Sequence, residues 1–206
     1  MTPVYKLSAS SITGRTTYGS MLAGNPAYEL PGDYQSIATV TVGSGGASSV
    51  SFTSIPATYT HLQIRAIAKD NQSAHTDDGI YMYLNGDTGA NYTRHSIVGD
   101  GATVAAYGSA NTSIAAVGQS ATSNASQNNV FAPNIIDILD YANTNKYKTI
   151  RALTGMDTNS SIGVIIPRSC LWRNTSAITS IELKSVGGTY NFVEYSTFAL
   201  YGIKSA

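Results

Sequence analysis

The chain has 206 residues, enough for one substantial hydrophobic core, and its 12 basic and 12 acidic residues cancel to a formal net charge of zero. Proteins that bind nucleic acid usually carry an excess of Lys and Arg, so this balance argues against a nucleic-acid partner. The apolar runs are far shorter than the roughly 20 residues of a membrane-spanning helix, so membrane insertion is not expected. The opening residues also lack the charged and apolar regions of a signal peptide.

Residues 1–33 differ from the rest of the chain. They are rich in Ser, Thr and Gly, and they keep neither the two-residue period of a strand nor the 3.6-residue period of a helix. Such a segment buries too little apolar surface to order itself, so we expect an extended N-terminal arm that docks on a neighbouring subunit. The alternative is an arm laid over its own domain. The residues expected to bind the partner are Val4, Tyr5, Leu7, Ile12, Tyr18, Met21 and Leu22.

Residues 34–206 form a second region of short alternating runs. Residues 38–42 and 50–52 flank the turn Gly43-Ser44-Gly45-Gly46, which predicts a hairpin. Residues 102–128 are small and polar, and they predict either one or two short strands around Ile114 and Val117 or a loop. One helical turn is expected over residues 141–146. Further strands are predicted over residues 61–68, 80–84, 92–98, 130–139, 148–156, 162–172, 177–186 and 190–203.

Eight to ten strands with Gly- and Asn-rich turns predict an all-β fold, an antiparallel sandwich or barrel. A jelly roll fits the strand count best, and the absence of a fixed repeat argues against a propeller or solenoid. The two domains are then an arm over residues 1–33 and a sandwich over residues 34–206. The expected core consists of Val40, Val42, Phe52, Leu62, Ile64, Ile80, Met82, Leu84, Ile150, Ile181, Leu183, Phe198 and Leu200.

The sequence offers little for catalysis or metal binding. His61, His75 and His95 have no metal-ligand spacing, and Cys170 lies in an apolar run that predicts a buried side chain. We therefore expect no catalytic residue, no metal and no cofactor. Asp70, Asp77, Asp78, Asp87 and Asp100 fall in or near expected loops, where calcium could bind, but the regular spacing of a calcium loop is missing and ordinary turn roles are the stronger interpretation.

Tyrosine outnumbers phenylalanine by 14 to 4. A tyrosine joins a large apolar ring to a hydroxyl, which suits subunit interfaces and sugar stacking, although half-buried sheet positions explain many of them equally well. The residues considered for glycan or subunit contact are Tyr81, Tyr83, Tyr92 and Tyr190.

Several motifs between residues 34 and 203 are distinctive as a series. They include TVTVGSGGA at residues 39–47, LNGDTGANY at 84–92, ILDYANTNKYKT at 138–149, NTSAITSI at 174–181 and TFALYGI at 197–203. Together they resemble a family of virion structural proteins of tailed phages that infect aquatic bacteria, including cyanobacteria.

The resemblance implies a non-enzymatic component of the virion, either a capsid decoration or a tail or fibre protein. It brings no catalytic residues to this chain. Its expected partners are other capsid or tail proteins, and analogy with fibres and capsid decorations suggests a homotrimer. The alternative is a carbohydrate-binding module of a tail fibre that recognises a host surface glycan, and a glycan-cleaving enzyme is a third class.

Overall fold

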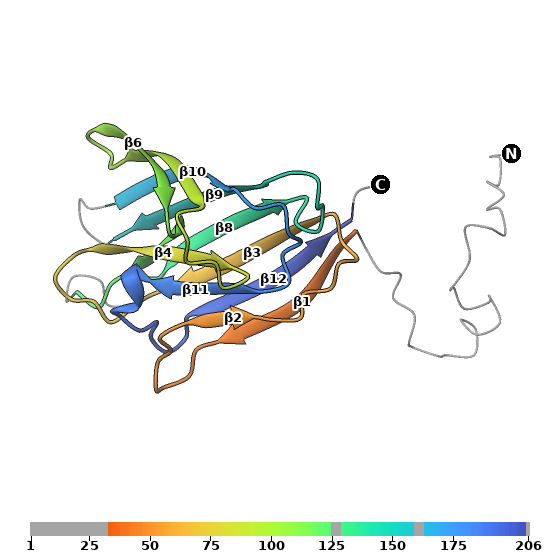
Figure 1. Cartoon of the computed structure of the whole chain (residues 1–206). Coiled ribbons are helices and arrows are strands. Elements are labelled where there is room, and N and C mark those ends of the chain that lie inside the picture. Colours follow the sequence, from red (N-terminus) through yellow and green to blue (C-terminus); the bar gives the residue numbers. More distant parts are fainter. Residues whose placement is uncertain (1–32, 125–128, 159–162, 205–206) are drawn as a thin grey trace, which may run out of the picture. The chain divides into compact units, whose positions relative to one another are not determined.

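The computed structural model describes residues 33–124, 129–158 and 163–204 (Figure 1). These residues form two antiparallel sheets that pack face to face as a sandwich, which confirms the predicted all-β class. The expected arm lies outside the described residues except for Asp33. No helix in the described ranges is long and apolar enough to span a membrane.

The larger sheet has eight strands and the smaller has four. In spatial order the larger sheet runs β1 (Tyr34–Thr41), β12 (Thr197–Ile203), β3 (His61–Ala68), β8 (Ala132–Leu139), β9 (Lys148–Asp157), β10 (Gly163–Trp172), β5 (Tyr92–Gly99) and β6 (Val104–Thr112). The smaller sheet runs β2 (Val50–Phe52), β11 (Ile181–Ser185), β4 (Asp77–Leu84) and β7 (Ala115–Ala121). A short 3₁₀ turn, η3 (Val186–Gly188), follows β11.

The core fills the space between the two sheets. Alternate residues of β3 and β4 point inward and are buried, as the two-residue period predicts. Phe192 and Phe198 pack with ring centroids 4.8 Å apart in the same cluster. The expected core residues are all buried except Val40, which is only partly buried because β1 is an edge strand of the larger sheet.

The predicted hairpin over residues 38–52 is wrong. β1 pairs with β12 in the larger sheet, whereas β2 pairs with β11 in the smaller one. The glycine-rich segment between them therefore crosses from one sheet to the other. The alternation marked both segments as strands, but it carried no information about which strand each would pair with.

Four other segments were predicted incompletely or incorrectly. Residues 102–128, left open by the sequence, contain two strands, β6 and β7, which belong to different sheets. The last predicted strand begins only at Thr197, because Tyr195 has a φ of +71° and Ser196 bonds to the backbone of Lys69 instead of joining a ladder. The predicted strand over residues 177–186 is likewise reduced to β11, and residues 141–146 form turns without a helix.

Candidate binding surface

The outer face of the larger sheet carries a groove of about 950 Å³. β5 and β6 line one side of it, β8 and β9 line the other, and β10 lies between them. In Figure 1, β6 stands at the upper margin of the sheet, away from β2 and β11. The apolar residues of the groove are Ile97, Ala106, Tyr107, Ile135, Ala152, Leu153 and Pro167.

Large apolar side chains in this groove face solvent. Leu153 lies opposite Ile135 on one neighbouring strand and opposite Pro167 on the other, so the three form a continuous apolar row. Leu153 is 48% exposed and Ile97 is 53% exposed. Contiguous apolar side chains that face solvent are candidates for an interaction site.

A row of polar side chains crosses the same face beside the apolar row. Its members Tyr201, Gln63, Asp137 and Arg151 occupy paired positions on four successive strands. Gln63 Nε2 donates to Asp137 Oδ1 at 2.7 Å, and Arg151 Nη2 donates to Asp137 Oδ2 at 3.1 Å. The Asp137 and Arg151 charges neutralise one another, so this pair adds hydrogen-bonding groups to the row but little net charge.

Two aromatic rings end this polar row at the β1 edge. Tyr34 stacks on Tyr201 with ring centroids 4.7 Å apart and an angle of 22° between the planes. The Tyr34 hydroxyl donates to Gln63 Oε1 at 2.8 Å, and the Arg65 guanidinium lies 6.0 Å from the Tyr34 ring centroid. Aromatic rings beside planar hydrogen-bonding groups are suited to contact with a ligand that has both apolar and hydroxyl-bearing faces.

A second polar group is buried between the sheets around Asp70. Asp70 Oδ2 accepts the Ser120 hydroxyl at 2.5 Å and the Ser185 hydroxyl at 2.6 Å. Burial raises the pKa of Asp70, against the effect of these hydroxyl bonds. Burial, with the neighbouring Asp70 carboxyl, also raises the pKa of Asp78 to about 6, and Asp78 Oδ2 has no hydrogen-bond partner among the described residues.

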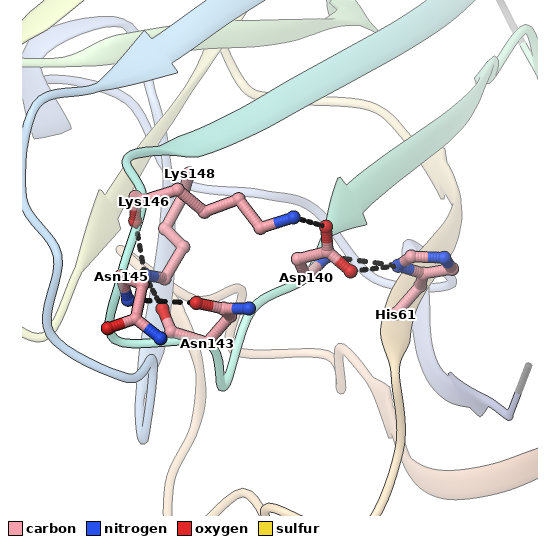
Figure 2. Close-up of polar contacts among 6 residues, drawn as sticks. All are labelled: His61, Asp140, Asn143, Asn145, Lys146 and Lys148. Carbon is pink, nitrogen blue, oxygen red and sulfur yellow. Dashed lines mark hydrogen bonds and ion pairs between the residues drawn. The ribbon is translucent and has the colours of Figure 1, made fainter.

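Figure 2 shows a third polar cluster, where the turn between β8 and β9 meets the start of β3. The Asp140 backbone N–H donates to His61 Nδ1 at 2.9 Å, so this ring nitrogen acts as the acceptor. Lys146 Nζ donates to Asp140 Oδ2 at 2.5 Å, and this bond is the main reason that the pKa of Asp140 is lowered. In a Ser-His-Asp triad the histidine Nδ1–H must donate to the carboxylate, and here Nδ1 accepts a hydrogen bond from a backbone N–H instead.

Lys148 is the buried member of the cluster in Figure 2. Its ammonium donates to the carbonyl oxygens of Asn143 at 2.5 Å, Lys146 at 3.0 Å and Thr175 at 3.0 Å. These three bonds use all three donors of the ammonium, and burial lowers its pKa. The group therefore fixes the turn to the start of β9 and has no donor left for a ligand.

The structure separates the four candidate tyrosines. Tyr92 is fully buried: it stacks on Trp172 and its hydroxyl donates to the Asp87 carbonyl, so its predicted role in glycan or subunit contact is wrong. Tyr81 and Tyr83 are partly buried on the outer face of β4, where the Lys184 ammonium lies 5.3 Å from the Tyr83 ring centroid. Tyr190 is partly buried in a loop. None of the four lines the groove.

The five aspartates considered for calcium do not form one site. Asp87 holds its turn through Trp172 Nε1 at 2.7 Å and the Gly89 backbone N–H at 2.8 Å, and Asp100 caps the turn between β5 and β6. Within the described ranges there is no group of three or more acidic, histidine or cysteine side chains placed to hold a metal ion. Cys170 is buried as predicted, and burial raises its pKa to about 11.

Other candidate residues lie elsewhere or were missed. The seven arm residues from Val4 to Leu22 lie outside the described residues. The groove residues Ile97, Ile135, Leu153 and Pro167 were not identified from the sequence. The sequence did contain a signal for an exposed apolar residue. In residues 148–156 the positions that alternate with the buried ones are mostly polar, but they include Leu153.

The chain was compared with protein-family models, curated proteins and solved structures, and none of the three comparisons returned a match.

Proposed function

We propose that this protein is a non-enzymatic structural component of a tailed-phage virion, a capsid decoration or a tail or fibre protein, that binds neighbouring virion proteins through the outer groove. The observation that carries the binding role is the solvent-facing apolar row of Ile135, Leu153 and Pro167. The assignment to a phage particle rests on the sequence motifs described above.

The chemistry of the partner follows from the groove. Its apolar row would take apolar side chains, and its open trough on a sheet suits an extended segment better than a compact surface. Residues 1–33 of the chain itself, expected from the sequence to be an extended arm, include the apolar residues Val4, Tyr5 and Leu7. We therefore propose that the arm of one copy docks in the groove of a neighbour.

Three titratable side chains outside the groove hold the fold together. His61 Nδ1 accepts a backbone N–H, Asp70 is held by two serine hydroxyls, and Lys148 is held by three carbonyls. Each is committed to holding the fold, and none of the three lines the groove.

We also infer that the sandwich has jelly-roll connectivity. Four strands of the larger sheet follow the order β1-β12-β3-β8, and the smaller sheet follows the order β2-β11-β4-β7. Each step from β1 to β2, β3 to β4, β7 to β8 and β11 to β12 then passes from one sheet to the other, as in a roll of eight strands. On this reading β5, β6, β9 and β10 are additions, and they supply most of the groove.

The particle assignment is tested by immunogold labelling of intact phage and by incorporation of variants into particles. Leu153→Lys places a charge in the apolar row and should reduce incorporation at least tenfold without changing the melting temperature. Thr149→Lys, an exposed position on the outer face of the same strand and outside the groove, is the matched control and should incorporate normally. Deletion of residues 1–33 should also block incorporation. Full incorporation of both altered proteins would refute the groove and arm as attachment sites.

A second candidate function is recognition of a host surface glycan. The observation that favours it is the Tyr34–Tyr201 ring pair beside Gln63 and Asp137, because sugars stack on aromatic rings and exchange hydrogen bonds with such side chains. A glycan array should then show binding that Tyr34→Ala abolishes and Leu153→Lys leaves intact. An array without a positive glycan would eliminate this candidate.

A further inference from the structure

Strand β6 is one of the two edge strands of the larger sheet, and it buries none of its nine residues. Val104 is 78% exposed and Tyr107 is 58% exposed. Within the described residues β6 pairs only with β5, so its other side presents a row of unpaired backbone N–H and C=O groups. Such an edge is a template for another strand.

The other three sheet edges are protected. At the β7 edge the Asn134 side chain accepts the Gln119 N–H and donates to the Gln119 carbonyl, each at 2.8 Å. β2 has only three residues, and β1 has an irregularity between Ser36 and Ala38. Short strands, bulges and covering side chains are the usual means of blocking strand addition.

β6 lacks these means over most of its length. Its pairing with β5 is regular from Val104 to Ser109, and the register shifts only near its C-terminal end. It contains neither proline nor a charged residue, and the whole stretch from Gly101 to Ile136 has no Lys, Arg, Asp or Glu. An edge of this kind is left open to a partner strand.

The absence of charged residues from β6 also indicates which partner strand it takes. When two identical strands pair antiparallel about a twofold axis, residues near the axis lie opposite or diagonal to their own copies, so any charge there would repel itself. β6 meets this condition along its entire length. A foreign strand would place no such requirement on it.

We propose that β6 pairs antiparallel with β6 of a second copy of this chain about a twofold axis. The pairing joins the two larger sheets into one continuous sheet and covers Val104 and Tyr107. Because Tyr107 also lines the groove, the two grooves then lie side by side across the axis. This inference rests on the proposed assembly role and makes the basic unit a dimer, in place of the trimer expected from analogy.

The test uses the full chain and sedimentation velocity at micromolar concentration. Tyr107→Lys and Tyr107→Glu should each weaken dimerisation at least tenfold, because the introduced charge meets its own copy across the axis. An equimolar mixture of the two variants should recover the dimer, since opposite charges then face one another. Tyr147→Lys is the matched control, at a tyrosine of similar exposure (50%) in the turn before β9, and it should remain dimeric. Circular dichroism confirms that each variant is folded.

A wild-type chain that is monomeric or trimeric would overturn the proposal, as would a Tyr107→Lys protein that stays dimeric. A mixture that fails to recover the dimer would also overturn it. The β6 edge would then be assigned to pairing with the arm or with another virion protein. Particle incorporation is measured separately. A protein that is monomeric in solution but still enters particles would refute the β6 contact alone and leave the proposed function standing.

Discussion

Asn134 on β8 pairs with the backbone of Gln119 on β7 as another strand would. Its Oδ1 accepts the Gln119 N–H and its Nδ2 donates to the Gln119 carbonyl, each at 2.8 Å, while the Thr154 hydroxyl donates to the same Oδ1 at 2.6 Å. This side chain joins the edge of the smaller sheet to the inner face of the larger one.

Asn134→Ala should therefore destabilise the protein. The substitution leaves a buried N–H and a buried C=O without partners, which costs about 2–4 kcal/mol in the free energy of unfolding. Urea denaturation measures the loss. Asn145→Ala, at an exposed asparagine, is the control and should change stability by less than about 0.5 kcal/mol. A loss at Asn134 no larger than the control would show that Gln119 finds other partners.

Gly118→Ala tests the close approach at the same point. A Cβ at residue 118 would lie 2.5 Å from Asn134 Oδ1, so we expect a loss of about 1–3 kcal/mol from the forced displacement. The loss should be smaller in the Asn134→Ala background, because the opposing oxygen is then absent. A double-mutant cycle measures this coupling, and strict additivity of the two losses would contradict it.

Asp78→Asn should stabilise the protein at pH 7 and not at pH 4. The pKa of Asp78 is about 6 in the folded state, above its unfolded value near 4, so the folded protein holds the extra proton between these two pH values. The wild-type free energy of unfolding consequently falls through this group as pH rises from about 4 to about 6. Since the side chain is only partly buried, we expect a gain from the amide of about 1–2 kcal/mol at pH 7.

The measurement is the difference in free energy of unfolding between Asp78→Asn and wild type across that pH range. Taking the difference removes the opposite contributions of Asp87, Asp100 and Asp140, whose lowered pKa values are common to both proteins. A difference that does not change with pH would show that Asp78 titrates normally.

Lys148→Met should destabilise the protein far more than Lys146→Met. The first substitution leaves the Asn143, Lys146 and Thr175 carbonyls without their buried donor. It also removes a buried charge, which is favourable, so we expect a net loss of about 2–4 kcal/mol in the free energy of unfolding. The second removes the exposed Lys146–Asp140 pair, worth less than about 1 kcal/mol. Thermal or urea denaturation compares them, and equal losses would count against the role assigned to Lys148.

Leu62→Ala should cost about 2–5 kcal/mol, because Leu62 is fully buried between the sheets. Ile67→Ala, on the outward face of the same strand, is the control and should cost about 0.5 kcal/mol or less. The slope of the free energy of unfolding against urea concentration should not change for either variant. A larger loss at Ile67 than at Leu62 would mean that the strand faces are reversed.

The period-two pattern alone determined the all-β class, most of the strands and nearly the whole core. In residues 61–68 and 80–84 the apolar positions alternate, and each inward side chain follows from its neighbours two residues away. The same local argument predicted that Cys170 is buried. The argument failed at Val40, which was expected in the core but is only partly buried because its strand lies at the edge of a sheet.

Only the tertiary structure decided which strands pair and which apolar residues stay exposed. β1 and β2 were expected to pair with each other, but their partners, β12 and β11, lie far along the chain, and no local pattern encodes that choice. Leu153 and Ile135 are as apolar as core residues, and their exposure follows from the smaller sheet covering one face of the larger sheet and not the other. The buried positions of Lys148 and Tyr92 likewise depend on carbonyls and rings that only the folded chain brings together.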